Sequence, residues 1–196
     1  MKQDVLELMK QLDKDNIRTQ MVLQCSPLFT GLKVSNLLIV PGEDEADLSE
    51  ILEGTGIEYA ALTELKDRTI FFLYRRERLC RWLEKEENRS FLEDYGFRDC
   101  TLDDILHIVS VRYRAYSAGH GAFPHEIGIL LGYPVQDVKG FVVNDGRNYL
   151  CSGYWKVYGN LSEARKTFRK YELAKETLLR RILEGISIRN IIASCG

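Results

Sequence analysis

The sequence predicts an α+β fold, in which a mainly antiparallel sheet of about five strands is flanked by helices. Apolar β-type runs and segments of helical periodicity follow one another irregularly, without the repeated strand–helix–strand order of a parallel sheet. The chain has 196 residues, of which 45% are hydrophobic, which is enough for one core and too short for two ordinary domains with a linker. We therefore expect a single domain over residues 1–196.

Three local patterns predict the strands. The run NLLIV at 36–40 is short, apolar and followed by Pro-Gly, as is typical of a strand. The runs IEYAAL at 57–62 and TIFFLY at 69–74 flank a polar connection, which indicates an antiparallel hairpin. The dipeptide Asp145-Gly146 stands between two β-rich runs and predicts a second hairpin.

Helical periodicity and end signals predict the remaining elements. Thr101 opens a Thr-x-x-Asp cap before an apolar stripe. Asn160 with Glu163 resembles a capping box and starts a long helix that ends at Gly185. Further helices are predicted over residues 2–13, near an interruption by Pro27 and Gly31 in 24–33, over 45–54, and as one broken or two short helices over 75–96.

The segment FPHEIGILLGYP at 123–134 predicts one more helix. Pro124 suits the first helical turn, because its fixed φ is helical and its missing N–H has no partner there anyway. His125 and Glu126 would then occupy that first turn with defined directions. Gly128 would allow another part of the chain to approach this helix closely.

Charge and hydropathy exclude several classes of function. The 27 basic and 29 acidic residues give a net charge of −2, so no overall attraction to nucleic acid or to an anionic membrane is expected. The basic residues of the last long helix are interpreted as a solvated face of mixed charge. The first residues are charged every few positions and no stretch approaches the ~20 apolar residues of a membrane span. We expect a cytoplasmic protein without a signal peptide or membrane association.

The cysteines agree with this location. They are odd in number, widely spaced and without a C-x-x-C pair, which favours reduced thiols over a disulfide framework or a thiolate zinc site. They are Cys25, Cys80, Cys100, Cys151 and Cys195.

Three motif blocks stand out along nearly the whole chain: QCSPLFTGLK at 24–33, FPHEIGILLGYP at 123–134 and GYWKVYG at 153–159. With these blocks, the sequence resembles a family of uncharacterised bacterial proteins, chiefly from anaerobic Firmicutes, catalogued as domain of unknown function 3793. The resemblance implies no activity or cofactor, so the cofactor stays unknown.

The first block and the second suggest a thiol site. Cys25 would be a nucleophile, His125 its general base, and Glu126 or Asn144 the group that orients the imidazole. Lys33 is a nearby cation that would favour the thiolate. The alternative is that Cys25 is a small buried hydrophobe and that His125 and Glu126 make structural hydrogen bonds.

Aromatic and basic residues suggest a ligand site instead. Lys33, Tyr133, Trp155 and Lys156 are the candidate ligand-binding residues. Lys156 alternates with Trp155 along the predicted strand, so it would be displayed toward an anion or toward a carboxylate such as Glu126. Tyrosines of the same region, Tyr149, Tyr154 and Tyr158, could line a pocket for a planar ligand.

No metal site is predicted. His120, His125 and Glu126 have suitable ligand atoms, but adjacent helical residues project about 100° apart, so His125 and Glu126 would not face one metal together. His107 is predicted to lie in the middle of a helix, packed or solvated.

Three functions therefore stay open, and the sequence leaves it uncertain whether the protein is an enzyme. The first is a small-ligand or partner-binding domain with a pocket near Cys25, His125 and Trp155. The second is a Cys-His thiol enzyme, a hydrolase or acyl transferase. The third is an interaction protein in which the motifs are only architectural.

Overall fold

Backbone contacts divide the chain into two compact units. Unit 1 comprises Met1–Arg75 and Arg169–Gly196, and unit 2 comprises Arg76–Phe168. The single-domain organisation stays a prediction. The predicted helix over 2–13 falls almost entirely outside the described residues. The computed structural model describes residues 10, 12–13, 16–41, 45–65 and 67–195.

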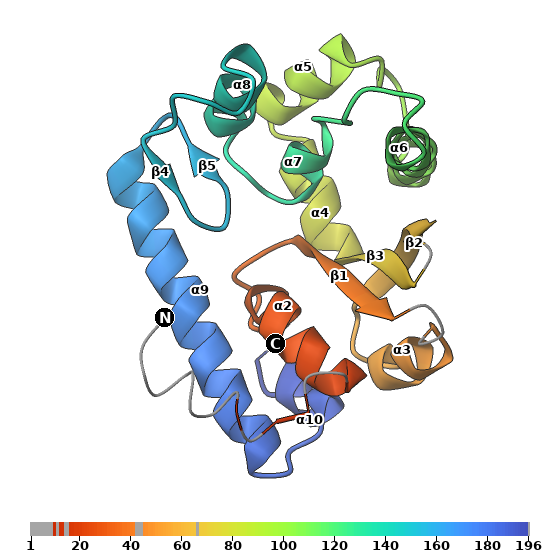
Figure 1. Ribbon diagram of the computed structural model, residues 1–196, viewed down its shortest axis with the longest axis vertical. Helices are drawn as coiled ribbons and strands as arrows, with labels where there is room; N and C mark the ends of the chain where they lie inside the picture. The colour runs from red at the N-terminus through yellow and green to blue at the C-terminus, as the bar shows by residue number, and fades with distance from the viewer. Residues whose placement is uncertain (1–9, 11, 14–15, 42–44, 66, 196) are drawn as a thin grey trace. The chain divides into compact units, whose positions relative to one another are not determined.

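Unit 1 is built on a three-stranded antiparallel sheet (Figure 1). Its strands are β1 (Ser35–Pro41), β2 (Glu58–Leu65) and β3 (Arg68–Tyr74), in the order β1-β3-β2. The central strand β3 is buried from Thr69 to Tyr74, because it is paired on both edges and its residues are apolar. The predicted strand at 36–40 and the predicted hairpin of 57–62 with 69–74 are confirmed.

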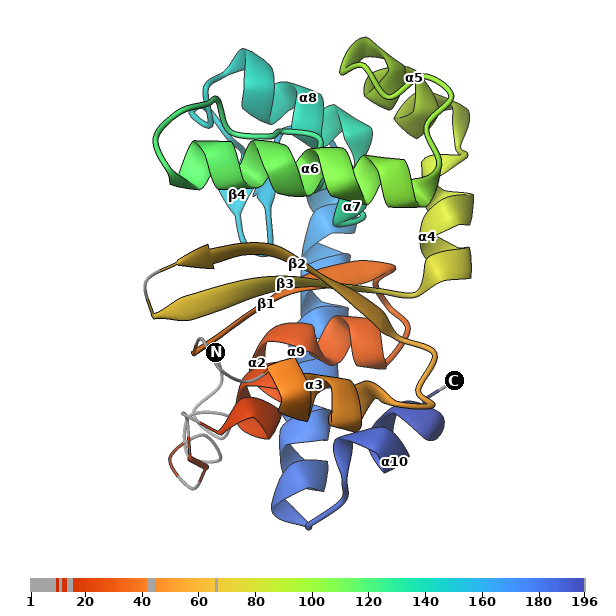
Figure 2. The same cartoon turned by 90° about the vertical axis from the view of Figure 1, so that its right-hand side faces the viewer.

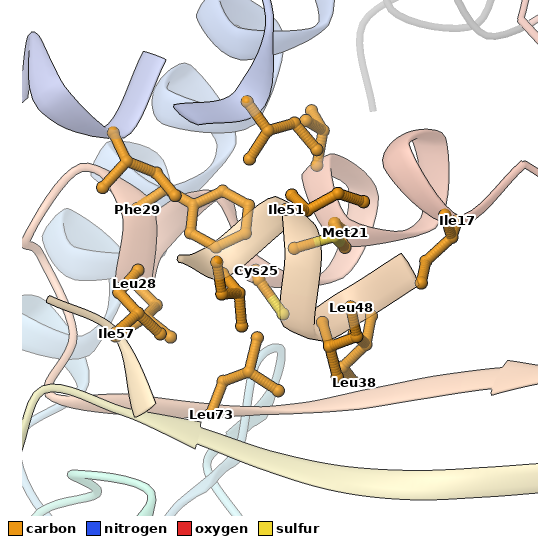
Figure 3. Close-up of a cluster of buried hydrophobic side chains, with 14 of the residues drawn as sticks. Ile17, Met21, Cys25, Leu28, Phe29, Leu38, Leu48, Ile51, Ile57 and Leu73 are labelled. Carbon is orange, nitrogen blue, oxygen red and sulfur yellow. The ribbon is translucent and has the colours of Figure 1, made fainter. Parts of the chain in front are cut away.

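Helices α2 (Ile17–Phe29) and α3 (Glu45–Leu52) lie on the same face of this sheet (Figure 2). The C-terminal part of α9 (Leu161–Leu183) and the short α10 (Ile188–Ala193) complete unit 1. Side chains from all four helices and from the sheet form one hydrophobic cluster, part of which Figure 3 shows. Burial of this cluster is the main stabilising term for the unit.

Pro27 does not interrupt α2 as expected. It lies two residues before the end of the helix, where it removes one hydrogen bond and leaves most of the helix intact. The helix ends at Phe29, and Gly31 follows with φ +69°. The chain then turns into β1 through Lys33, whose backbone N–H donates to the Pro27 carbonyl at 2.9 Å.

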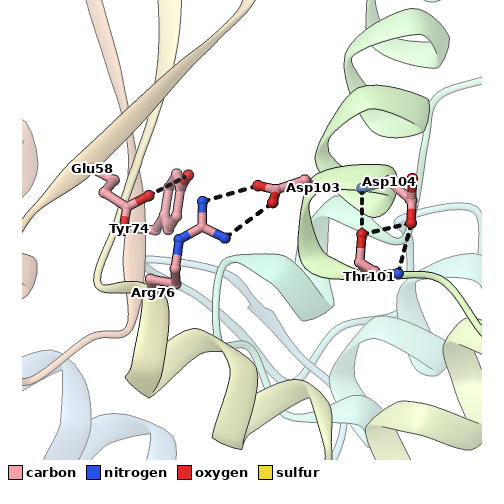
Figure 4. Close-up of polar contacts among 6 residues, drawn as sticks. All are labelled: Glu58, Tyr74, Arg76, Thr101, Asp103 and Asp104. Carbon is pink, nitrogen blue, oxygen red and sulfur yellow. Dashed lines mark hydrogen bonds and ion pairs between the residues drawn. The ribbon is translucent and has the colours of Figure 1, made fainter.

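Unit 2 is mainly helical. The predicted cap at Thr101 is confirmed as a reciprocal capping box with Asp104, and Arg76 pairs with Asp103 of the same turn at 2.9 Å (Figure 4). A two-stranded antiparallel hairpin and the first residues of α9 close the unit. Its elements are α4 (Arg76–Leu83), α5 (Glu86–Asp94), α6 (Leu102–Ser117), α7 (Ile127–Leu130), α8 (Val135–Val143), β4 (Cys151–Ser152) and β5 (Lys156–Val157).

The expected single main sheet is wrong. The described strands are about five in number, but they form two separate sheets of three and two strands. The hairpin predicted at Asp145-Gly146 is also wrong, because the β-rich residues before it form the end of α8. Asp145 and Gly146 have φ of 50° and 67°, which ends the helix and starts the loop to β4.

The helix predicted from Pro124 begins later than expected. Pro124 and His125 precede α7, and Glu126 is its N-cap residue. The turn is closed by the Ile127 N–H, which donates to the Pro124 carbonyl at 3.1 Å, and by the Gly128 N–H, which donates to the His125 carbonyl at 3.0 Å. Across the described residues, no helix combines the length and the apolar character needed to cross a membrane.

Candidate functional site

Cys25 lies inside the core of unit 1 and not on its surface. It belongs to α2, is fully buried, and is surrounded by apolar side chains (Figure 3). Its sulfur lies 3.7 Å from the Leu37 carbonyl of β1. Burial raises the pKa of the Cys25 thiol from 9.0 to about 12, because desolvation disfavours the thiolate. The thiol is therefore protonated at neutral pH.

Lys33 and Asn36 form a small polar network beside this thiol. The Lys33 ammonium donates to the Asn36 side-chain oxygen at 2.7 Å, and the Asn36 amide donates to the Gln24 carbonyl at 2.8 Å. The same amide lies 3.7 Å from the Cys25 sulfur. Burial lowers the pKa of Lys33 from 10.5 to about 8. These contacts join the end of α2 to the start of β1 and account for a lysine within an apolar unit.

Glu126 forms an ion pair with Arg112. Its carboxylate accepts from the Arg112 guanidinium of α6 at 2.7 Å, and the Glu126 side chain is only 2% exposed. Arg112 also donates to the Tyr95 carbonyl at 3.1 Å and stacks on the Phe97 ring at 4.8 Å. Glu126 thus ties the turn before α7 to α6, and the expected approach of Lys156 to Glu126 is replaced by this pairing.

The His125 ring is held among aromatic rings. Its centroid lies 5.4 Å from that of Phe123 and 5.7 Å from that of Phe141 on α8. Asn144, the other residue expected to orient the imidazole, donates to the Gly140 carbonyl at 2.8 Å and caps the end of α8. No hydrogen bond joins the His125 ring to any residue that the structure describes.

Asp137 fixes the hairpin of unit 2 to α8. Its buried carboxylate accepts from the Trp155 indole N–H at 2.6 Å. It also accepts from the backbone N–H groups of Tyr158 and Gly159, both at 2.8 Å. Three donors on one carboxylate make this a strong anchor, since hydrogen bonds to an ionised acceptor are stronger than neutral ones.

Trp155 and Tyr133 form a stacked pair that rests on this anchor. Their ring centroids are 5.2 Å apart at an interplanar angle of 29°, and Trp155 meets Phe168 edge-on at 4.5 Å. Burial raises the pKa of Tyr133 to about 12. Gly128 sits nearby, where an added Cβ would come within 2.9 Å of Val138. The expected close approach at Gly128 is therefore made by α8.

Lys156 contacts two aromatic rings and one backbone carbonyl. We call the residues involved the Lys156 cluster: Phe141, Gly146, Tyr149 and Lys156. The ammonium lies 5.4 Å from the Phe141 ring centroid and 5.1 Å from that of Tyr149. It donates to the Gly146 carbonyl at 2.7 Å. Gly146 is required there, because its φ is +67° and an added Cβ would lie 3.3 Å from the ammonium.

The candidate residues thus fall into two groups. Cys25 and Lys33 belong to unit 1, whereas His125, Glu126 and the three ligand-binding candidates of the later motifs belong to unit 2. Each group is a set of real contacts within its own unit, and a Cys25–His125 pair stays a prediction. Within the described residues, no three His, Cys, Asp or Glu side chains are placed to hold one metal ion.

Sequence reasoning missed the residues that organise unit 2. No role was predicted for Asp137, because the residues after Pro134 were expected to be β-rich and not helical. Arg112 and Phe141 were missed because their partners, Glu126 and Lys156, are distant in sequence. Only the position of Asp137 in the first turn of a helix that Pro134 can start offered a local signal.

A family model described as a protein of unknown function, DUF3793, matches residues 21–192. No curated protein and no solved structure matches the chain.

Proposed function

Because the chain belongs to the DUF3793 family, whose description states no activity, we propose a function from the geometry. Unit 2 is a ligand-binding module that takes a small planar anion at the Lys156 cluster. The observation that supports this most is the position of one ammonium between two aromatic rings. Planar ligands stack on such rings, and the cation selects those that carry a negative charge.

The cluster has groups with which to bind. Lys156 is half-buried and Tyr149 is 45% exposed. An ammonium has three N–H donors, and the Gly146 carbonyl accepts one of them. The ring of Tyr158 packs against Gly140 of α8, and its buried hydroxyl lacks a hydrogen-bond partner among the described residues. A polar ligand that reached this hydroxyl would relieve the cost of leaving it unpaired.

The ligand-binding hypothesis is preferred to a thiol enzyme because of the environment of Cys25. A nucleophilic cysteine needs an accessible thiolate, whereas Cys25 is fully buried with its pKa raised to about 12. The His125 imidazole, packed between Phe123 and Phe141, becomes in our proposal an edge of the ligand site and not a general base. The cytoplasmic location remains our proposal on the sequence grounds given above.

The test is a titration of the full chain with adenosine monophosphate and with adenosine, followed by ¹H–¹⁵N NMR. These two probes share a planar ring system and differ in the phosphate. We expect saturable shifts at the amides of Phe141, Gly146 and Tyr149, with the monophosphate binding more tightly. Lys156→Gln should weaken monophosphate binding about tenfold, since a hydrogen bond to a charged group is worth about 1.5 kcal/mol or more.

The matched control is Lys139→Gln, which removes an exposed lysine from α8. It should leave the affinity for adenosine monophosphate unchanged. Equal loss in both variants would mean non-specific charge attraction, and equal binding of the two probes would remove the role given to Lys156. The absence of shifts in the cluster up to millimolar probe would reject adenine-type planar anions as ligands there.

A second candidate function is the binding of a protein partner next to the same cluster. Val143 is 83% exposed and Leu150 is 56% exposed, and both flank it in the chain. Exposed apolar side chains gathered in one place mark interaction surfaces. If the partner is a second copy of this chain, light scattering should show a dimer that Val143→Ser converts to a monomer.

A further inference from the structure

A second candidate site lies in unit 1, away from the residues used so far. A cavity of about 430 Å³ is lined by the start of α2 and by the connection between α9 and α10. Its size is within the range of small-ligand sites, which is about 300–1,000 Å³. Both lining segments belong to unit 1, so the cavity is a feature of one compact body.

One side of the cavity is apolar. Ile182, Ile186 and Ile188 line it, and Ile188 is a buried member of the main hydrophobic cluster. Ile182 and Ile186 pack against that same cluster while remaining partly exposed. An aliphatic chain laid along these side chains would remove apolar surface from water, which favours binding.

The other side is suited to an anion. The first turn of α2 borders the cavity through Asn16, Arg18 and Thr19. This thirteen-residue helix has no acidic residue in its first turn, and the Asn16 side chain caps the Arg18 N–H at 2.9 Å. A helix N-terminus carries partial positive charge, and the exposed guanidinium of Arg18 adds a full one.

Thr19 provides an independent indication of a ligand. The residue lines the cavity although it is only 4% exposed. No hydrogen bond joins its hydroxyl to any other residue that the structure describes. Because this hydroxyl has no hydrogen-bond partner among the described residues, it can donate to a carboxylate oxygen of a ligand in the cavity.

We propose that this cavity binds an aliphatic monocarboxylic acid. The carboxylate lies at the first turn of α2, where Arg18 and the Thr19 hydroxyl receive it, and the chain lies along the three isoleucines. Asp13 also lines the cavity and opposes the ligand charge, but it is exposed, so solvent and salt weaken the repulsion. The site is independent of the Lys156 cluster.

The experiment compares octanoate with octan-1-ol on the full chain by ¹H–¹⁵N NMR. These probes share a chain of the same length and differ in the carboxylate. We expect saturable octanoate shifts confined to the amides of residues 16–19 and 182–188, and weaker binding of the alcohol. Thr19→Val should raise the Kd of octanoate about tenfold and leave that of the alcohol unchanged.

Three further variants keep the outcome clear. Thr177→Val, at an exposed position of α9, is the matched control and should not change the octanoate Kd. Should Thr19→Val fail to fold, Arg18→Gln tests the anion site instead, because it removes the exposed positive charge and should weaken octanoate binding but not octanol binding. Asp13→Asn should tighten octanoate binding at low ionic strength, since it removes the opposing charge.

The proposal fails if octanol binds as tightly as octanoate, because the anion site would then contribute nothing. It also fails if octanoate produces no saturable shift up to millimolar concentration, or if its shifts spread equally through unit 2. None of these results depends on the Lys156 cluster, so failure here and failure of the planar-anion proposal are distinguishable.

Discussion

The carboxylate of Asp137 should be the most sensitive single group of unit 2. Asp137→Ala would leave the Trp155 indole N–H and the Tyr158 and Gly159 backbone N–H groups without their acceptor. At about 1.5 kcal/mol for each hydrogen bond to a charged group, the loss in unfolding free energy should be about 4.5 kcal/mol. Asp94→Ala, at an exposed position of α5, should change it by less than about 0.5 kcal/mol.

A double-mutant cycle tests the geometry more directly than the single variants. Asp137→Asn keeps an oxygen for the two backbone donors but turns an N–H₂ group toward the Trp155 N–H, so it should cost about 2 kcal/mol. In a Trp155→Phe background that clash is gone, and the same substitution should cost only about 1 kcal/mol. The coupling between the two positions should therefore be about 1 kcal/mol.

Urea unfolding by circular dichroism gives the free energies, and amide hydrogen exchange at Tyr158 and Gly159 gives the local response. Exchange at both amides should accelerate in Asp137→Ala and stay slow in Trp155→Phe, which leaves both backbone bonds in place. A free energy for Asp137→Ala within about 0.5 kcal/mol of the wild type, or a coupling of zero, would refute the hydrogen-bond arrangement.

Two further predictions concern buried charge. Arg112→Met should cost about 3 kcal/mol in unfolding free energy, because it leaves the buried Glu126 carboxylate without a partner. Glu126→Gln should cost only about 1 kcal/mol, because the Arg112 guanidinium that it leaves unpaired is 40% exposed and water can reach it. A larger loss for Glu126→Gln than for Arg112→Met in urea unfolding would contradict this. Lys33 has a pKa of about 8 when folded against 10.5 otherwise, so the unfolded state binds more protons between these pH values. The stability of the wild type relative to Lys33→Met should therefore rise by up to about 3 kcal/mol from pH 8 to pH 10.5 and be constant below about pH 8, where Lys33 is protonated in both states. A difference that does not vary with pH would show that Lys33 titrates normally.

Local signals predicted the elements that local chemistry controls. The apolar run at 36–40, the cap at Thr101 and the Asn160 start of α9 were confirmed, because strand runs and caps involve residues only a few positions apart. The prediction of a hairpin at Asp145-Gly146 was wrong because local propensity did not decide the structure there. The residues before it have strand propensity, but they form α8, whose buried face packs in unit 2, and such packing overrides propensity.

For the candidate site, the sequence indicated residues but not their contacts. The motifs drew attention to residues that make specific contacts in the structure, namely Cys25, Lys33, Glu126 and Trp155. The pattern around them did not reveal what those contacts are. A buried carboxylate looks the same in sequence whether it serves as a catalytic acid or as the partner of a distant arginine.

The sequence by itself determined the α+β class, most of the helices, the strands of the larger sheet and the family. Only the tertiary structure decided that Cys25 is a buried thiol with a raised pKa, that Glu126 belongs to Arg112, and that Lys156 lies between two rings. The reason is physical. Helix and strand formation depend on neighbours along the chain, whereas burial, pKa and ion pairing depend on neighbours in space, which the folded chain brings together from distant positions.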